Sequence, residues 1–375
     1  MTSEWKHFAL GEITELVIDY RGKTPKKLGG DWCKQGYRAL SAKNIKTGRI
    51  VQAETIRYID ESLYRKWMKD EVQRGDILIT SEAPFGQIFF WDSDEKIVLS
   101  QRLFCVRIKP EYDARFIYYY MTTPEFQSEL DGRATGTTVI GLRQPELMKC
   151  VIRCPEIQEQ KVIAAILSSI DAKIIANEKV NDNLQQQAQA IYSSMFIDNP
   201  DPAWSHGHLS DLITVKYGKD HKKLADGIYP VYGSGGIMRY VERPLYNKES
   251  VLIPRKGTLN NVMYVNQPFW SVDTMFYTEM KLPNVAKFVY HFVKAKDLAS
   301  MNAGSAVPSM TTDILNAMEV VIPSASALEE FESLVAPMYE AMEANDVQSK
   351  ALSQMRDTLL PKLMSGEIDV SDVQL

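Results

Sequence analysis

The stretch "PEIQEQKVIAAILSSIDAKIIANEKVNDNLQQQAQAIYSSMF", residues 155–196, decides the architecture. Apolar side chains recur every seven residues in it, at Ile163, Ile170, Leu184 and Ile191. A complementary seam is filled by Ile166, Ile174, Val180, Ala188 and Met195. A heptad spacing predicts a long α-helix that packs along another helix in a coiled coil. The proline and the glutamate at its start suit a helix N-terminus.

The same pattern returns in residues 323–364, "PSASALEEFESLVAPMYEAMEANDVQSKALSQMRDTLLPKLM". At the same heptad phase this copy has Phe331, Met338, Leu352 and Leu359. It therefore predicts a second long helix. Pro337 lies inside the pattern and lacks the backbone N–H that a helix interior uses, so we expect this helix to kink there or to start anew.

An asparagine occupies the middle core position of both patterns, at Asn177 and Asn345. A single buried asparagine typically fixes the register of a coiled coil at some cost in stability. We therefore expect the two helices to pair antiparallel within the chain, with Asn177 beside Asn345 near a pseudo-twofold axis. The alternative is two amphipathic helices that each pack separately on their own part of the chain.

The duplication includes the segments around the helices. "EWKHFALGEI" at 4–13 is echoed by "AWSHGHLSDL" at 203–212. "RATGTTVIGL" at 133–142 is echoed by "MNAGSAVPSM" at 301–310, with Gly136 matching Gly304. A repeat of this length indicates a duplicated pair of domains. The first copy is longer by about 30 residues, which predicts that the two copies have diverged in what they do.

The segments between the helices are expected to be rich in β-structure. Strands are predicted at 75–80, 87–91, 102–108, 250–254, 261–265 and 274–280, and helices at 114–130 and 285–295. The predicted fold class is α+β, in which two mixed, β-rich modules alternate with two long helices that form an antiparallel intramolecular coiled coil. The expected divisions are 1–154, 155–198, 199–322 and 323–375.

Composition and charge narrow the class of protein. Hydrophobic residues make up 45% and charged residues 24% of the 375-residue chain, which is typical of soluble globular proteins. With no run of 18 apolar residues, we expect a cytoplasmic protein without membrane contact, whose four cysteines are reduced. The net charge is −5, but residues 323–375 alone contribute −7. Residues 19–49 hold nine Lys and Arg against two Asp, a pattern typical of phosphate-binding surfaces or of a merely solvated loop.

Motifs for catalysis are incomplete. "RGKT" at 21–24 lacks the upstream glycine of a phosphate-binding loop, and "DNPD" at 198–201 lacks the second proline and the aromatic residue of an amino-methyltransferase motif. The "DEK" at 94–96 has no upstream acidic partner, and the five histidines have no metal-ligand spacing. We therefore expect a protein that is not an enzyme and holds no cofactor or metal of its own.

Basic and amide side chains in both modules are the candidates for DNA contact. Lysine suits phosphates, whereas Arg, Asn and Ser can also read base edges. The candidates of the first module are Arg21, Lys23, Thr24, Lys26, Lys27, Arg38, Ser41, Lys43, Asn44 and Lys46. Those of the second are Lys216, Tyr217, Lys219, His221, Lys222, Tyr232, Ser234, Arg239, Arg255, Lys256, Asn260 and Asn261.

Taken in order, these motifs resemble the specificity (S) subunits of type I restriction–modification systems along essentially the whole chain. In the first copy the resemblance rests on "W-x-x-x-x-L-G-E-I" at 5–13, "GKTP" at 22–25, "GDILIT" at 75–80, "GTTVIGL" at 136–142 and "CPEIQEQKVIAAIL" at 154–167. In the second it rests on "YPVYGSGG" at 229–236, "VPSM" at 307–310 and "LLPKLMSGEI" at 359–368. "IPSASALEEF" at 322–331 departs from the family's P-x-x-E-Q form.

The resemblance implies two target recognition domains that each read one half of a split, asymmetric sequence in double-stranded DNA. The long helices would act as a ruler for the unread gap. The implied partners are two adenine methyltransferase subunits and two restriction (motor–nuclease) subunits, which would carry S-adenosylmethionine, ATP and magnesium. The alternatives are a protein-interaction scaffold that no longer reads DNA and a fused specificity–methyltransferase enzyme; the missing catalytic motifs argue against the latter.

Overall fold

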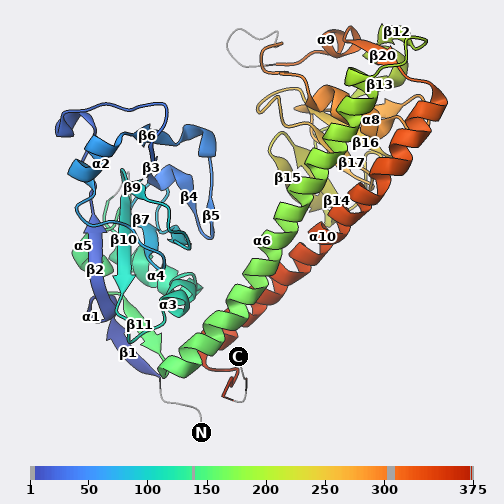
Figure 1. The fold of residues 1–375 in the computed structure, drawn as a ribbon. Coiled ribbons are helices and arrows are strands. Elements are labelled where there is room, and N and C mark those ends of the chain that lie inside the picture. Colours follow the sequence, from blue (N-terminus) through green and yellow to red (C-terminus); the bar gives the residue numbers. More distant parts are fainter. Residues whose placement is uncertain (1–4, 137–139, 302–308, 372, 374–375) are drawn as a thin grey trace. The chain divides into compact units, whose positions relative to one another are not determined.

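The computed structural model describes residues 5–136, 140–301, 309–371 and 373, and the chain divides into two compact units (Figure 1). Unit 1 comprises Met1–Ile175 and Gln348–Leu375, and unit 2 comprises Ala176–Val347. Each unit joins one β-rich module to parts of both long helices. We call residues 1–154 module 1 and residues 199–322 module 2. Within the repeated stretch, residues 137–139 and 302–308, Gly304 included, lie outside the described residues.

The two heptad patterns form the two longest helices. They are α6 (Ile157–Ser193), which ends in a π-helical turn (η4, Ser194–Asp198), and α10 (Ala325–Ser365). In unit 1, Arg356 of α10 bonds Asp171 of α6, with 2.8 Å between Nη1 and Oδ1. In unit 2, Asn345 of α10 contacts Asn177 of α6. Because later residues of α6 meet earlier residues of α10, the pairing is antiparallel, which confirms the predicted intramolecular coiled coil (Figure 1).

The two middle asparagines lie together as predicted, and Asn181 and Asp346 join them in the same polar layer. The Asn177 amide donates to the backbone oxygen of Asn345 at 3.4 Å. The Asn345 amide donates instead to Asn181 Oδ1 at 2.8 Å, and the Asn181 amide donates to Asp346 Oδ1 at 2.8 Å. The polar layer is thus wider than one pair. That it fixes the register stays a prediction.

Pro337 does not begin a new helix, so that part of the prediction is wrong. Residues Ala325–Ser365 form one continuous helix. A proline in a helix interior costs about 3 kcal/mol because one hydrogen bond is lost. Around Pro337 the side chains of Phe331, Val335 and Tyr339 are buried in the core of unit 2, and this packing offsets the loss.

Each module contains a four-stranded antiparallel sheet of the same strand order. In module 1 the order is β2 (Thr14–Asp19), β10 (Leu103–Ile108), β7 (Ile77–Thr80) and β8 (Ile88–Phe90). In module 2 it is β13 (Ile213–Tyr217), β19 (Met275–Met280), β16 (Ser250–Pro254) and β17 (Met263–Val265). All six predicted strands are present in these two sheets.

The smaller sheets repeat as well. The order β6 (Arg57–Ile59), β3 (Tyr37–Leu40), β9 (Ile97–Leu99) corresponds to β15 (Gly236–Val241), β14 (Asp226–Gly233), β18 (Trp270–Ser271). In both, the central strand is antiparallel to the first neighbour and parallel to the second. Two-stranded sheets pair β1 (Lys6–Ala9) with β11 (Val151–Cys154), and β12 (Ser205–His208) with β20 (Glu319–Ile322).

Short helices complete the repeat. Helix α1 (Leu10–Ile13) corresponds to α7 (Leu209–Leu212), α3 (Ala114–Met121) to α8 (Ala286–Lys294), and α5 (Gln144–Leu147) to α9 (Thr312–Asn316). Module 1 also has α2 (Glu61–Trp67), α4 (Pro124–Arg133), β4 (Ile45–Lys46), β5 (Arg49–Ile50) and the 3-10 turns η1 (Lys26–Leu28), η2 (Ala42–Asn44) and η3 (Ala53–Thr55). These elements account for its greater length.

The single helix predicted over 114–130 is wrong in one respect, because the segment forms two helices. Helix α3 ends at Met121 and α4 begins at Pro124. The Thr123 hydroxyl caps α4 by accepting from the Phe126 N–H, and Pro124 stands at the first position of the new helix. A proline there favours a helix start.

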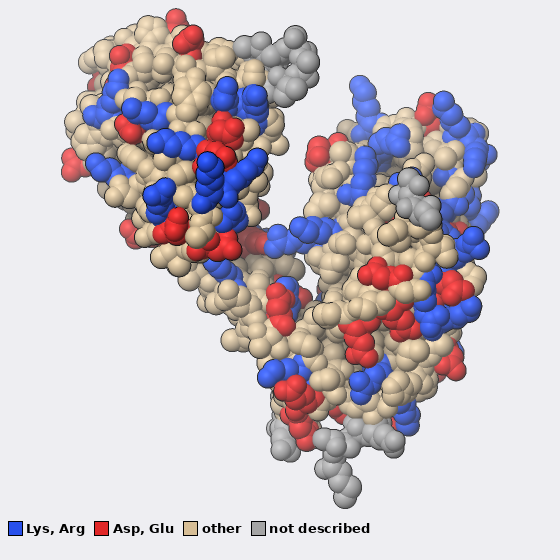
Figure 2. Space-filling model, turned by 180° about the vertical axis from the view of Figure 1, so that it is seen from behind, with Lys and Arg blue, Asp and Glu red and all other residues tan. Residues whose placement is uncertain are grey.

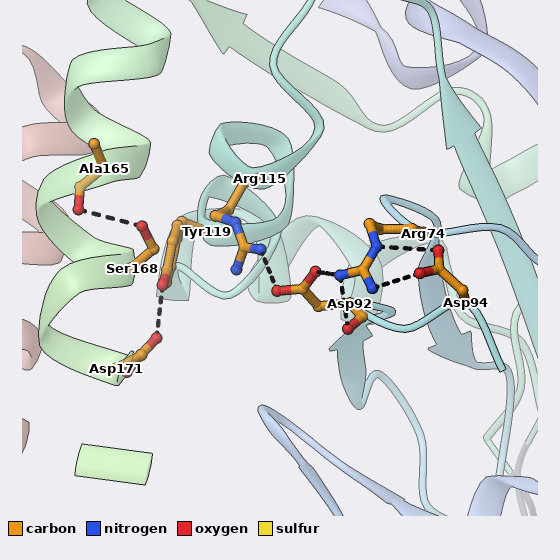
Figure 3. A network of polar contacts seen from close by, with 8 residues as sticks. All are labelled: Arg74, Asp92, Asp94, Arg115, Tyr119, Ala165, Ser168 and Asp171. Carbon is orange, nitrogen blue, oxygen red and sulfur yellow. Dashed lines mark hydrogen bonds and ion pairs between the residues drawn. The ribbon is translucent and has the colours of Figure 1, made fainter. Parts of the chain in front are cut away.

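A polar contact between Tyr119 and Asp171 joins module 1 to the long helices (Figure 3). The apolar core of unit 1 includes Ile163 and Leu363 of the same helices. The Tyr119 hydroxyl of α3 donates to Asp171 of α6 at 2.7 Å, and Arg356 of α10 binds the other oxygen of Asp171. One helical turn before Tyr119 on α3, Arg115 binds Asp92 at 2.8 Å, and Asp92 in turn binds Arg74.

Module 2 uses different chemistry at the equivalent place. Aligning "AKFVYHFV" of α8 with "ARFIYYYM" of α3 puts His291 at the position of Tyr119. Nδ1 of the buried His291 donates to Gln189 Oε1 of α6 at 2.8 Å, so Nε2 accepts from the Tyr339 hydroxyl of α10 at 3.0 Å. Burial, with a smaller effect of Lys294, lowers the pKa of His291 to about 4.

Candidate nucleic-acid interface

A surface cavity of ≈ 500 Å³ opens in module 1 at the end of β7. Its walls come from four separate segments: the turn after β2, the loop after β7, the loop before β10, and the segment that leads into α5. The lining residues are Arg21, Gly22, Ser81, Glu82, Gln101, Arg102, Thr135, Gly141, Leu142 and Arg143. Arginine is thus contributed by three of the four segments.

A backbone network fixes the shape of this cavity. The Ser81 N–H donates to the Arg102 carbonyl at 2.9 Å, and the Leu142 N–H donates to the Ser81 carbonyl at 3.0 Å. Ser81 thereby connects the strand-end loop to both neighbouring segments. Arg102 has a φ of 65° and Ala83 a φ of 41°, and both values lie in the left-handed region that non-glycine residues rarely adopt. Such residues cluster at binding sites, where the surrounding structure holds them.

Two arginines of the cavity form ion pairs, one with a cavity residue and one with a residue outside the lining. Arg102 binds Glu82 at 2.8 Å, with 47% and 35% of the two side chains exposed. Arg21 binds Asp19 at 2.8 Å, and its guanidinium lies 4.0 Å from the centre of the Phe104 ring. Exposed ion pairs contribute only about 0–1 kcal/mol. Arg102 and Glu82 can therefore exchange each other for a ligand at small cost. Arg21 is held more firmly, by Asp19, the Leu142 carbonyl and the Phe104 ring.

Of the DNA-contact candidates in module 1, only Arg21 lines the cavity. The Lys23 amine donates to the Trp67 carbonyl at 2.6 Å and lies 3.7 Å from the centre of the Tyr20 ring, and burial lowers its pKa. Lys27 donates to the Gly22 carbonyl at 2.7 Å, and Arg38 is held by Glu95. These three side chains stabilise loops. Thr24, Lys26, Lys43 and Lys46 remain partly or fully open to solvent.

Asn44 is a correction to the candidate set. Its side chain is buried, with 1% of the residue exposed. Its Oδ1 accepts from the Ser41 hydroxyl at 2.8 Å, and its Nδ2 donates to Thr55 Oγ1 at 3.0 Å. A buried amide with its hydrogen bonds made inside the fold stabilises the turn and is closed to DNA. Ser41 belongs to the same turn.

Several candidates in module 2 also have structural partners. Tyr232 is buried, and its hydroxyl accepts from Gln267 at 3.3 Å. Arg239 binds Asp226 at 2.8 Å. Three further contacts involve the Asn261 amide with the Ser234 carbonyl, the Asn260 amide with Asp297, and the Lys216 amine with Glu279. Tyr217, Lys219, Lys222 and Lys256 are exposed, and His221 is half-buried.

Arg255 of module 2 occupies the same backbone frame as Ser81 of module 1. The Arg255 N–H donates to the Thr274 carbonyl at 2.9 Å, and the Met310 N–H donates to the Arg255 carbonyl at 2.9 Å. The Arg255 guanidinium lies 5.4 Å from the centre of the Tyr217 ring. The predicted residues Arg255 and Lys256 thus stand where module 1 has its cavity.

Four charged or amide residues of the cavity were not among the candidates: Glu82, Gln101, Arg102 and Arg143. The basic stretch 19–49 supplied all the candidates of module 1, and it contributes only Arg21 and Gly22 to the cavity. A signal was nevertheless present. Aligning "GDILIT" with "ESVLIP" places Glu82 opposite Lys256, a reversal of charge directly after matched strands.

The surface carries mixed charge. Figure 2 shows Lys and Arg gathered on both modules, with Asp and Glu between them. Within residues 5–136, 140–301, 309–371 and 373, no group of three or more His, Cys, Asp or Glu could hold a metal ion. In the same ranges, no helix combines the length and the apolar character that crossing a membrane requires.

Comparison with known proteins identifies the family. The family model described as type I restriction modification DNA specificity domain matches residues 2–186 and 203–331. The MjaIX specificity subunit of Methanocaldococcus jannaschii is 24% identical over 344 residues, which cover 80% of this chain and 79% of the relative. The HindI specificity subunit of Haemophilus influenzae is 20% identical over 418 residues, which cover 80% of this chain and 88% of the relative.

Among solved structures, the S subunit of the type I restriction–modification system from M. genitalium has the same fold. Its TM-score is 0.62 at 18% identity, and the match covers 96% of both chains. The family match spans nearly all of both modules, most of α6 and the start of α10. The chain therefore belongs to the DNA specificity subunits of type I restriction–modification systems, the non-catalytic components that give these enzymes their DNA sequence specificity.

Proposed function

We propose that this chain reads a bipartite, asymmetric target in double-stranded DNA, one half-site with each module. The observation that supports this is the duplication itself, because two modules share their sheet orders yet present different side chains. Module 1 also has four helices and strands without counterparts in module 2, so the two half-sites should differ. Base edges in the major groove distinguish all four base pairs, which gives each module enough information to select its own sequence.

The antiparallel helices would set the unread gap between the half-sites. We propose that Asn177 and Asn345, together with Asn181, hold their register. A gap set by helices predicts a simple length relation. A heptad adds about 10 Å of helix, close to three base pairs of DNA at 3.4 Å per pair.

We further propose that the chain assembles with two adenine methyltransferase subunits and two restriction subunits. S-adenosylmethionine, ATP and magnesium would be bound by those partners, and the assembly would act in the cytoplasm. The strongly acidic segment 323–375 suits a protein-binding surface, because phosphate repulsion would oppose DNA there.

The test is to map methylated adenines in cells that carry this chain with its methyltransferase. The expected motif has two unlike half-sites around a fixed gap. A palindromic motif would contradict the asymmetry. Inserting one heptad after Lys173 and a matching heptad before Ser349, which leaves the asparagine layer together, should lengthen the gap and leave both half-sites unchanged. If the gap stayed constant while the bases changed, the ruler would be wrong.

The scaffold alternative makes a different prediction for non-specific binding. A DNA-reading chain neutralises phosphates, so its affinity for random duplex should fall steeply as salt rises. A protein-interaction scaffold should show no such slope. The measurement is a salt titration of the full-length chain with labelled random duplex DNA.

A further inference from the structure

We propose that the loop after β7 and the loop before β10 carry the base-reading side chains of module 1, and that the matching loops after β16 and before β19 carry those of module 2. The principal readers of module 1 are Glu82 and Arg102. This inference rests on the proposed DNA-reading function. It moves the principal readers from the lysines of the stretch 19–49 to the cavity at the strand ends, where Arg21 and Gly22 are the members of that stretch in the lining.

The first argument is that both modules build one backbone frame at this place. Ser81 and Arg255 each donate an N–H to the loop before the central strand, in both cases at 2.9 Å. Their carbonyls each accept from the segment that leads into α5 or α9, at 3.0 Å from Leu142 and 2.9 Å from Met310. The frame is therefore independent of the side chains that it carries.

The second argument is that the side chains on this frame differ in chemistry. When the two frames are aligned, Glu82 is equivalent to Lys256, and Arg102 is equivalent to Thr274. A matched backbone whose exposed side chains reverse in charge is what two readers of different sequences require. The surrounding strands β7 and β16 kept their buried apolar pattern, so the divergence lies in the loop side chains.

The third argument is the fit between the Glu82–Arg102 pair and a base pair. An arginine donates two hydrogen bonds to O6 and N7 of guanine, and a glutamate accepts from N4 of cytosine. The Arg102 guanidinium and the Glu82 carboxylate lie 2.8 Å apart. They can therefore bind neighbouring acceptor and donor groups on the edge of one base pair. The pair therefore suits a G·C pair read from the major groove. Gln101 and Arg143 in the same cavity can contact a neighbouring base or phosphate.

Backbone geometry supports a functional origin for this arrangement. Arg102 adopts a φ of 65° although it is not glycine. An arginine that only served solubility would gain nothing from this conformation. The left-handed residue turns the chain into β10 while its side chain stays half-exposed beside Glu82.

The experiment selects bound sequences from a randomised duplex pool, using the full-length chain with its methyltransferase subunits. Glu82→Gln and Arg102→Gln should each reduce the preference at one base pair of one half-site roughly ten- to hundredfold. The gap, the other half-site and the remaining positions should not change. Lys256→Glu should alter only the other half-site. Arg65→Gln is the matched control, because Arg65 forms an exposed ion pair with Glu61 on the same module and should leave the selected motif unchanged.

Three outcomes would overturn the inference. Glu82→Gln and Arg102→Gln could return the parental motif, or they could weaken all sequences equally, as a phosphate contact would. Arg65→Gln could change the motif as much as Arg102→Gln. In each case the parental chain would still select a bipartite motif, so the proposed function would stand. If the parental chain itself selected no sequence, the proposed function would fail instead. Thermal unfolding of each variant shows that it is folded.

Discussion

The two junctions between module and helix make the same connection with opposite chemistry. In unit 1 the hydroxyl belongs to the module, at Tyr119, and the acceptor Asp171 lies on a long helix. In unit 2 the hydroxyl of Tyr339 lies on a long helix, and the acceptor His291 belongs to the module. Asp171 and Tyr339 are equivalent residues of the duplicated helices. The duplication has thus kept a donor–acceptor pair and exchanged its two ends.

The exchange changes the character of each junction. The first is ionic, because Asp171 also binds Arg356, and both side chains are partly exposed. The second is neutral and aromatic, with His291 stacked on Tyr192 and close to Phe331. Each module is therefore matched to its own helix positions. A module moved to the other junction would meet a helix residue of the wrong chemistry unless its helix partner residues moved with it.

The largest expected effect comes from the apolar residues at equivalent core positions. Phe331→Ala should destabilise unit 2 by about 4 kcal/mol, and Ile163→Ala should destabilise unit 1 by about 3 kcal/mol, because both residues are fully buried. Calorimetry of the full chain can assign each loss to one transition. If both substitutions lowered the temperature of the same unfolding transition, the two units would unfold together and not independently.

The next effect distinguishes the junctions by pH. Unfolded His291 binds a proton near pH 6.5, whereas the folded side chain resists protonation until its pKa of about 4. The stability that the neutral ring provides is therefore complete above pH 6.5 and is lost as pH falls toward 4, by up to about 3 kcal/mol. Tyr119 at the equivalent position stays protonated throughout this range, because burial and Asp171 raise its pKa.

The measurement is the melting temperature of each unit between pH 7.5 and 4.5. The unit 2 transition should fall more steeply than the unit 1 transition. His291→Phe removes the titrating group. The melting temperature of unit 2 should then fall with pH no more steeply than that of unit 1, even though the substitution lowers the stability of unit 2 at neutral pH. An equally steep unit 2 slope in His291→Phe would mean that another group titrates.

A smaller effect is expected from deleting single hydroxyls. Tyr119→Phe removes a hydrogen bond to a carboxylate and should cost about 1.5 kcal/mol, whereas Tyr339→Phe removes a neutral one and should cost about 1 kcal/mol. Urea titrations of the two variants test the order. Equal losses that both depend on salt would contradict the distinction between an ionic and a neutral junction.

The smallest effect on stability is expected at the asparagine layer. Asn177→Leu should change the free energy of unfolding by about 1 kcal/mol or less, because a buried polar residue in a coiled coil contributes specificity at some cost in stability. Its consequence should be a looser register. Disulfide trapping with cysteines placed on α6 and α10 would then capture more than one pairing, and a single trapped pairing would contradict the register role.

The sequence predicts the periodic parts of the fold and misses the local ones. Heptads predict α6 and α10 because a sustained apolar spacing needs a partner helix, and the asparagine in the middle of each pattern predicts their antiparallel pairing. The six strands follow from short apolar runs. The break between α3 and α4 was missed because the apolar period continues across Thr123, where a cap and a proline decide the outcome. Pro337 shows the reverse, since tertiary packing outweighs a strong local signal.

The candidate site was harder to predict because charge density is a poor guide to exposure. Lys23 and Asn44 have the residue types of DNA contacts, yet their polar groups are used within the fold. Glu82 was missed because an acidic residue does not suggest DNA until its partner Arg102 is seen beside it. Residues that are 20 positions apart form this pair only after β7 and β10 have paired.

The composition of unit 1 has a consequence for how the chain is made. Its core includes Leu363, Met364 and Val370 from the end of the chain, and Gly366 lies against the ring of Trp5 near the beginning. Unit 2 needs only residues up to Val347. During synthesis the module that emerges first therefore keeps part of its apolar face open until residues 363–370 leave the ribosome, whereas unit 2 can close once residue 347 has emerged. A chain that stops early would present that open face to other molecules.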